Sequence, residues 1–313
     1  MQKLASVVFS FRNEEKNLPL LIKKIQEQFS KLDTWDYEMI FVNDDSTDRS
    51  LSILHEEREK DPRIKIITMS RRFGVVPCFL AGFEAAAGDA VIYMDSDLQD
   101  PPELIPELIR RHEAGADVVH TVRTKRHGES FLKMRITRIA YLFINFFSSI
   151  PLHSNAGDYK LISRRALNAM LQMEENDPYI RGLSVWVGFN QTFVLYERQG
   201  RHAGKTHFSL LRSTAPFREF LRGLTSFSVV PLYFSLFLGF IISVGAFFYL
   251  IYILITRIFY GMHNPGWPAI MVTMLFLGGV ILFTIGIQGI YVGKIFEANQ
   301  RRPKYIIKEK DGF

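Results

Sequence analysis

The fold of this chain is decided by the stretch Ala90-Val91-Ile92-Tyr93-Met94-Asp95-Ser96-Asp97-Leu98-Gln99-Asp100-Pro101-Pro102. Its first part is apolar without a break, which is typical of a strand that is covered on both faces. Three acids follow, and two prolines then favour the start of a helix. A buried strand that ends in acids and leads into a helix is typical of a parallel α/β sheet, whose ligands bind at the carboxyl ends of the strands.

Other apolar runs share this length and character, and helical patterns separate them. The predicted strands are Leu4–Phe11, Tyr37–Val42, Ile64–Met69, Ala90–Met94 and Asp117–Val122, and the predicted helices are Asn17–Lys31, Ser46–Glu59 and Pro102–Ala114. Strands and helices that alternate in this way predict a mostly parallel, Rossmann-like sheet with helices on both faces. We expect one α/β domain over residues 1–210.

Two long uncharged stretches follow that domain, Val229–Thr256 and Trp267–Gly293. Each exceeds the roughly 20 apolar helical residues that cross the hydrocarbon core of a bilayer. They predict a hairpin of two transmembrane helices, 229–257 and 268–293. The alternative is a pair of buried core helices, although core helices seldom run so long without a charge.

The formal net charge is +6, and its distribution favours a membrane rather than nucleic acid as the partner. Positive residues flank the spans, and Arg257 is the only one between them; the others are Arg212, Arg218, Arg222, Lys294, Arg301, Arg302, Lys304, Lys308 and Lys310. Because positive residues near span ends stay in the cytoplasm, we expect a multi-pass protein of the cell (inner) membrane. Its first domain and its basic tail, 294–313, would be cytoplasmic, where anionic headgroups attract the positive charge.

Two further segments combine basic with apolar residues. Segment 131–150 carries Arg135 and Arg138, and segment 211–228 carries Arg218 and Arg222. Both patterns predict amphipathic helices in the headgroup plane, and a buried core helix is the alternative for the first. The second span contains small residues, Gly289 and Gly293, which allow transmembrane helices to pack closely. This pattern favours a homo-oligomer.

Two of the acids, Asp95 and Asp97, are two residues apart at the end of the apolar strand. Carboxylates that close repel each other unless a cation lies between them. Mg²⁺ and Mn²⁺ prefer oxygen ligands, and Mg²⁺ commonly takes one or two carboxylates together with substrate phosphates. The pair therefore predicts a divalent-metal site, and the alternative is a turn that caps a helix before Pro101.

Three further polar segments carry candidate functional residues. Asp44 ends the second strand, either as an acceptor of hydrogen bonds from a nucleobase or ribose, or in a solvated turn that caps the next helix. Asp158 follows a glycine, where an exposed turn, a helix cap and a catalytic carboxylate stay equally open. The basic loop 199–207, with Arg201 and Lys205, would either close over a diphosphate or form a flexible linker.

Taken in order, these motifs resemble those of the inverting family 2 glycosyltransferases, which have the GT-A fold. The matching residues are Asn13-Glu14-Glu15, Asn43-Asp44-Asp45-Ser46-Thr47-Asp48, Asp95-Ser96-Asp97-Leu98-Gln99-Asp100-Pro101-Pro102-Glu103 and Gly157-Asp158-Tyr159. With its terminal hairpin, the chain is similar to the polyprenyl-phosphate glycosyltransferase branch, which includes bactoprenol glucosyltransferases and dolichyl-phosphate mannose synthase. The resemblance covers the whole chain.

The resemblance implies a role for each matching residue. Asp158 would be the catalytic acid or base, and Asp95 and Asp97 would hold Mg²⁺ or Mn²⁺ on the diphosphate of the donor. The lipid phosphate of the acceptor would be bound by Arg123, Arg135 and Arg138. The donor nucleotide-sugar would be bound by Phe11, Asn13, Glu14, Asp44, Arg72, Ser96, Arg201 and Lys205.

The chain departs from the family pattern around the expected donor pocket. Ser10-Phe11-Arg12 replaces Pro-x-Tyr, and Asp45 occupies the position of a usual glycine. The family's Asn-Phe-Gly-Lys-Glu is replaced by Arg72-Phe73-Gly74-Val75-Val76. These differences concern the identity of the sugar and the base more than the type of reaction.

The implied reaction is the inverting transfer of a hexose from a UDP-sugar to undecaprenyl or another polyprenyl phosphate at the cytoplasmic membrane face. Glucose is the expected sugar, and a 4-amino-arabinose derivative, mannose from GDP-mannose and an N-acetylhexosamine stay open. A processive polysaccharide synthase fits less well, because two spans are few for a polymer channel and Gln-x-x-Arg-Trp is absent. A membrane-tethered nucleotide-sugar-binding scaffold would not need Asp95, Asp97 and Asp158 together.

Overall fold

The computed structural model forms two compact units, residues 1–226 with 302–313, and residues 227–301. The structure describes residues 2–126, 146, 156–198, 225, 228–260 and 266–313. Both predicted interfacial helices, 131–150 and 211–228, lie almost wholly outside the described residues, and so does the boundary expected near residue 210.

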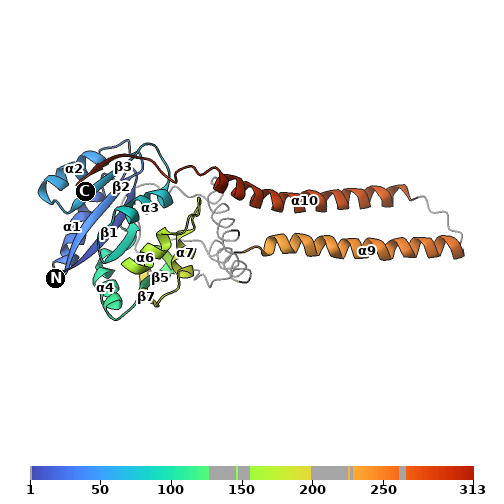
Figure 1. Ribbon diagram of the computed structural model, residues 1–313, viewed down its shortest axis with the longest axis horizontal. Helices are drawn as coiled ribbons and strands as arrows, with labels where there is room; N and C mark the ends of the chain where they lie inside the picture. Colours follow the sequence, from blue (N-terminus) through green and yellow to red (C-terminus); the bar gives the residue numbers. More distant parts are fainter. Residues whose placement is uncertain (1, 127–145, 147–155, 199–224, 226–227, 261–265) are drawn as a thin grey trace. The chain divides into compact units, whose positions relative to one another are not determined.

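The first unit is built on a sheet whose eight described strands have the order β7-β5-β6-β4-β1-β2-β3-β8 (Figure 1). Strands β3, β2, β1 and β4 are mutually parallel, whereas β6 is antiparallel to β4 and β5. The predicted α/β class with a mostly parallel sheet is confirmed. The strands are β1 (Lys3–Phe11), β2 (Trp35–Asn43), β3 (Ile64–Met69), β4 (Ala90–Asp95), β5 (Val118–Arg126), β6 (Ala156–Ser163), β7 (Gln191–Arg198) and β8 (Ile307–Asp311).

Helices cover both faces of this sheet because successive side chains of its buried strands point to opposite sides. Phe9 packs in one core with residues of α1 (Leu18–Phe29), α2 (Ser50–Lys60) and α4 (Ile105–Glu113). Val8 faces the other side, where α3 (Val75–Ala85) contacts β1 and α6. The remaining short helices of this unit are η1 (Pro102–Leu104), α6 (Arg164–Leu171) and α7 (Ile180–Trp186).

The start of α2 differs from its prediction. The helix begins at Ser50 rather than after a cap at Ser46. The Ser46 hydroxyl instead accepts the backbone N–H of Asn13 at 3.1 Å, and the Asp48 carboxylate accepts those of Glu15 and Ser50. The polar run before α2 is therefore used to join two loops, and the helix starts four residues later.

The end of the chain also differs from the predicted basic tail, 294–313. Residues Lys294 to Asn299 continue a helix, and β8 pairs antiparallel with β3. Asp311 forms an ion pair with Arg58 of α2, and its Oδ2 lies 3.2 Å from Nδ1 of His55. The outer edge of β3 would otherwise present unpaired backbone groups, and β8 satisfies them.

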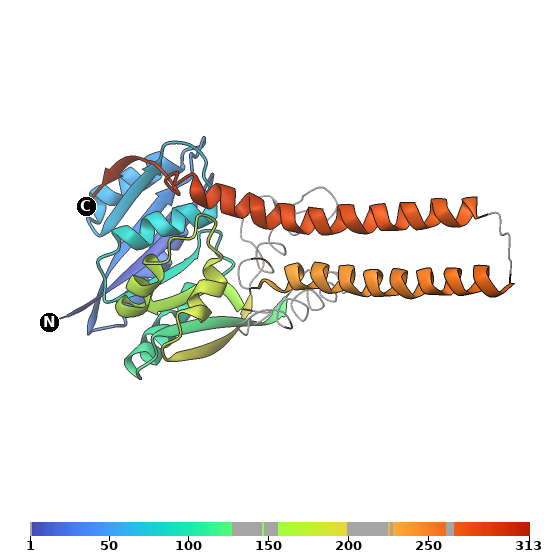
Figure 2. The ribbon, with the colours of Figure 1, turned by 45° about the vertical axis from the view of Figure 1, so that its right-hand side comes forward.

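The second unit consists of two long antiparallel helices, α9 (Val230–Tyr260) and α10 (Trp267–Asn299), which lie side by side (Figures 1 and 2). The Tyr291 hydroxyl of α10 donates to the carbonyl of Ser228 at 2.8 Å. By length and composition, both helices are able to cross a membrane, and their most apolar segments are not buried in the protein. The alternative of two buried core helices is therefore not supported.

Candidate active site

The carboxyl ends of three neighbouring parallel strands bring the predicted polar motifs to one edge of the sheet. In the register of the sheet, Phe11 of β1 is paired with Asn43 of β2, and Ser10 is paired with Asp95 of β4. The loops that follow these strands therefore start side by side. This is the edge at which α/β sheets bind ligands.

Hydrogen bonds join the loop after β1 to the loop after β2. The Asn13 side chain accepts the Thr47 N–H at 2.8 Å, and the Glu14 N–H donates to the Ser50 hydroxyl at 2.8 Å. The Glu14 carboxylate itself accepts from the Asn17 amide at 2.5 Å. These hydrogen bonds join the two segments beside the expected donor pocket.

Three residues without glycine's freedom adopt positive φ at this edge, one after each of β1, β2 and β4. They are Asn13 (φ 57°), Asp45 (φ 59°) and Leu98 (φ 60°). Left-handed backbone is unfavourable for most side chains and tends to gather at functional sites. Asp45 also stands where a glycine is usual, and its φ explains why glycine suits that position.

Asp44 is buried and holds the loop that precedes α3. Its carboxylate accepts the backbone N–H of Phe73 at 2.6 Å and that of Gly74 at 3.1 and 3.0 Å. Asp44 itself is therefore not part of a solvated cap of α2, because it is buried and holds the loop before α3. Arg72, in the loop that Asp44 anchors, has an exposed side chain.

Phe11 does not present its side chain to the loops. Its ring is buried in the core, edge-on to Phe41 with 6.3 Å between ring centroids. The Phe11 carbonyl accepts the Asp44 N–H at 3.0 Å. The Phe11 backbone therefore positions Asp44, and binding of the donor by Phe11 stays a prediction.

The pair Asp95 and Asp97 lies where β4 ends, with Asp95 half-buried and Asp97 buried. The Asp97 Oδ1 accepts the Gln99 N–H at 3.1 Å, and the Ser96 hydroxyl donates to the Ser10 carbonyl at 3.2 Å, which ties the turn to β1. Two carboxylates fit Mg²⁺ or Mn²⁺. Among the described residues no group of three His, Cys, Asp or Glu could hold a metal, so water and donor phosphates would complete its coordination.

Asp158 of β6 is paired with Arg181 of α7. Arg181 Nε donates to Asp158 Oδ1 at 2.7 Å, and Nη2 donates to Oδ2 at 2.5 Å. Burial raises the pKa of Asp158, but Arg181, with smaller contributions from Lys160 and Arg123, outweighs it and lowers the pKa to about 2. The carboxylate is therefore ionised at neutral pH and is a very weak base.

The buried Lys160 is linked to Arg181 of this pair through Ser184. Lys160 is 1% exposed, its Nζ donates to the Ser184 hydroxyl at 2.9 Å, and it lies 5.8 Å from the centre of the Tyr93 ring. The Ser184 hydroxyl in turn donates to the Arg181 carbonyl at 2.9 Å. Burial lowers the pKa of Lys160 to about 7, although Asp158 acts against the shift.

Arg123 of β5 is held by two partners from other segments. Its Nε donates to the Tyr196 hydroxyl at 2.9 Å, and its Nη2 lies 3.6 Å from the carboxylate of the buried Asp100. The Tyr196 hydroxyl donates to the same carboxylate at 2.5 Å. Arg123, expected to bind the acceptor, thus also fixes the end of the acidic loop after β4.

The structure brings together part of the predicted set. Asn13, Glu14, Asp44 and Ser96 meet at the loops after β1, β2 and β4, together with the acid pair. Four predicted basic residues lie outside the described residues, namely Arg135, Arg138, Arg201 and Lys205.

Sequence reasoning missed Arg181, Lys160 and Asp100 as members of the site. One signal was available for Arg181, because it stands among apolar residues in Tyr179-Ile180-Arg181-Gly182-Leu183. A charged residue in such a run needs a partner. Its partner lies 23 positions earlier and is set by the packing of α7 on β6.

Comparison with known proteins agrees with this geometry. Residues 6–171, which run from within β1 through β6, match the family model of glycosyl transferase family 2. The chain belongs to this family. The α/β sheet is accordingly of the GT-A type that the motifs implied.

Relatives of this family 2 chain match it over nearly the full length. The prophage bactoprenol glucosyl transferase homologue of Escherichia coli (strain K12) is 36% identical over 97% of this chain and 98% of its own. The bactoprenol glucosyl transferase of Shigella phage SfV is 36% identical over the same shares. A crystal structure of glucosyl-3-phosphoglycerate synthase from Mycobacterium tuberculosis, with Mn²⁺, UDP-glucose and phosphoglyceric acid, is 21% identical, with a TM-score of 0.47 over 72% of this chain and 79% of that chain.

Proposed function

We propose that the protein transfers glucose from UDP-glucose to a polyprenyl phosphate at the cytoplasmic surface of a membrane. The full-length similarity to bactoprenol glucosyl transferases supports both the sugar and the acceptor class. One observation of the structure carries the proposal furthest. The acids at the end of β4 and Asp158 of β6, which Arg181 of α7 pairs with, belong to neighbouring strands of one sheet, and the same chain carries two helices able to cross a membrane.

The donor would lie across the loops after β1, β2 and β4. The loop that Asp44 anchors would bind the uracil and ribose, with Arg72 beside it. A divalent ion held by Asp95 and Asp97 would supply positive charge at the departing diphosphate. Arg201 and Lys205 would add charge from the basic loop.

The reaction would be a single displacement. An oxygen of the lipid phosphate forms a bond to the anomeric carbon, the bond from that carbon to the UDP oxygen breaks, and its electron pair leaves with UDP. The anomeric configuration therefore inverts. A phosphate monoester has its second pKa near about 6, so it is mostly dianionic at neutral pH. No base is needed to deprotonate it, which agrees with the weak basicity of Asp158.

The two helices would hold this domain beside its acceptor. Since a polyprenyl phosphate cannot leave the membrane surface, anchoring the enzyme there raises the effective concentration of the two reactants. Arg135 and Arg138 would bind the lipid phosphate at headgroup depth, together with Arg123.

A donor panel tests the assignment. The purified full-length protein is incubated with undecaprenyl phosphate and each of several UDP- and GDP-sugars, and UDP or GDP release is measured. We expect turnover with UDP-glucose to exceed that with the other sugars by at least about tenfold. We also expect activity to vanish on chelation and to return with Mg²⁺ or Mn²⁺. Preference for GDP-mannose would refute the sugar assignment, and activity after exhaustive chelation would refute the metal site.

A further inference from the structure

The ion pair between Asp158 and Arg181 is built as a unit that a ligand can reach. The two parallel N–H···O bonds, at 2.7 and 2.5 Å, fix the plane of the guanidinium. The Arg181 side chain is 37% exposed and that of Asp158 is 27% exposed. Because more than a third of the Arg181 side chain is exposed, an anion can approach it from solvent.

The backbone that carries Arg181 is held from within the protein. Ser184, one turn later in α7, is fully buried; it accepts from Lys160 Nζ and donates to the Arg181 carbonyl. The guanidinium therefore projects from a braced helix rather than a loop. Such support is what keeps a binding group within the narrow range of productive geometry.

The other cations that act on Asp158 are less able to meet a ligand. Lys160 is 1% exposed, and the Arg123 side chain is 13% exposed and is held by Asp100 and Tyr196. Among the described residues whose positive charge lowers the pKa of Asp158, Arg181 is thus the most accessible.

The Asp158–Arg181 pair also lies close to the acids after β4. Tyr93 of β4 is paired with Lys160 of the antiparallel β6, so Asp95, two residues after Tyr93, and Asp158, two residues before Lys160, come from the same end of these neighbouring strands. A phosphate dianion that approaches between the Asp158–Arg181 pair and the acids at the end of β4 would be repelled by the carboxylate of Asp158. It needs a cation there to offset the repulsion.

We infer that Arg181 binds the phosphate of the lipid acceptor, with Asp158 as the anchor that orients its guanidinium rather than as a general base. This inference rests on the proposed function for the identity of the acceptor. It adds to the acceptor site an arginine from α7, beside those expected earlier in the chain. In this arrangement, Lys160 and Ser184 are positioning residues, which act through the backbone of Arg181.

The test compares four forms of the full-length protein, namely wild type, Arg181→Met, Asp158→Asn and the double variant. Direct binding of tritiated undecaprenyl phosphate and binding of UDP are measured separately. We expect Arg181→Met to weaken lipid binding by about tenfold to a hundredfold, the usual effect of losing hydrogen bonds to a charged group. UDP binding should stay within about twofold, because the donor binds at other loops.

The double variant separates ligand binding from charge neutralisation. If Arg181 only neutralises Asp158, removing both charges restores lipid binding, and that result would overturn the inference. If Arg181 binds phosphate, the double variant stays as weak as Arg181→Met. Arg181→Lys, which keeps the charge but not the paired geometry, should recover part of the binding.

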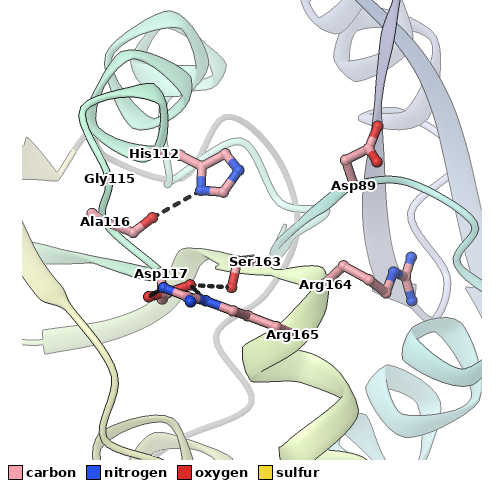
Figure 3. A pocket seen from close by; sticks show the side chains of 8 residues that line it. All are labelled: Asp89, His112, Gly115, Ala116, Asp117, Ser163, Arg164 and Arg165. Atoms are coloured by element: carbon pink, nitrogen blue, oxygen red, sulfur yellow. Dashed lines mark hydrogen bonds and ion pairs between the residues drawn. The ribbon is translucent and has the colours of Figure 1, made fainter.

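A matched control exists at the other end of the strands of the sheet. Arg165 also pairs with an aspartate, Asp117, through its Nε and Nη2, beside a pocket of about 300 Å³ (Figure 3). This pair lies at the amino end of β5, away from the loops after β1, β2 and β4. Arg165→Met should leave lipid and UDP binding unchanged, and a loss equal to that of Arg181→Met would indicate a general effect on the fold and overturn the inference.

The pH profile supplies a second readout. We expect kcat/KM of the wild type to fall below about pH 6, as the acceptor phosphate gains a proton. In Asp158→Asn, kcat/KM should fall at the same pH as in the wild type. If this fall at low pH were absent in Asp158→Asn, Asp158 would be the general base and the inference would be wrong. Should the wild type bind the lipid but transfer no sugar to it, the proposed function fails, while the binding comparison still decides the role of Arg181.

Discussion

Gly157 shows how one residue in this site depends on a neighbouring strand. A Cβ at this position would lie 2.8 Å from Nη2 of Arg123 and 3.2 Å from its Nε. The guanidinium therefore lies directly over the glycine, and only a residue without a side chain leaves room for it. This contact explains the glycine that precedes Asp158, since Arg123 must pass over it to reach Asp100.

The substitution Gly157→Ala should displace Arg123 without unfolding the protein, because the end of a flexible side chain can move. We expect kcat/KM to fall by about tenfold as the loop after β4 loses a support. The decisive comparison is Gly157→Ala in an Arg123→Met background. There the alanine should add no further loss, and an equal loss in both backgrounds would show that the contact is not the cause.

At the residue scale, the sequence allows prediction of groups whose position depends on their own strand. Asp44, Asp95 and Asp97 lie within three residues of the end of an apolar run, so their place at the strand ends could be predicted. The partners of Asp44, the N–H groups of Phe73 and Gly74, could not, because they come from a loop 29 and 30 positions away. The same holds for Arg181, whose pairing depends on how α7 packs on β6.

At the scale of single elements, β8 closes the sheet with a segment from the far end of the chain. The Ile306 carbonyl accepts the Ser70 N–H at 2.9 Å, and the Tyr305 hydroxyl donates to Glu84 of α3 at 2.5 Å. Its sequence, Ile307-Lys308-Glu309-Lys310-Asp311, is mostly charged and carries little strand signal. The strand forms because β3 offers an edge, which no local pattern reveals, whereas the apolar strands β1 to β4 were predictable.

Deleting residues 304–313 should destabilise the first unit, because β3 loses its pairing with β8 and the deleted segment no longer contacts α2 and α3. A loss of about 2 kcal/mol would lower the melting temperature by roughly 4–8 °C in a domain of this size. Differential scanning calorimetry of the purified full-length protein and the variant measures this. Removing only Gly312 and Phe313, which lie beyond β8, serves as the control. An unchanged melting temperature after the larger deletion would show that β8 adds nothing.

At the scale of the whole molecule, the chain joins a family 2 catalytic unit to a helical hairpin. The hairpin was predictable because length and lack of charge alone identify such helices. The extent of α10 was not, since the helix continues beyond the uncharged stretch through Lys294 to Asn299. Neither unit by itself specifies the acceptor; it is the combination of a sugar-transferring fold with apolar helices that favours a lipid acceptor over a soluble one.

The most direct test of this account is to incubate membranes that contain the protein with radiolabelled UDP-glucose and to follow the label. We predict label in a short lipid product that chloroform–methanol extracts and that mild acid releases as glucose. The Asp95→Asn/Asp97→Asn variant should give no such product. Label in a long polymer would instead indicate a processive synthase, and no incorporation of label would indicate a binding scaffold; either result would contradict transfer of glucose to a polyprenyl phosphate.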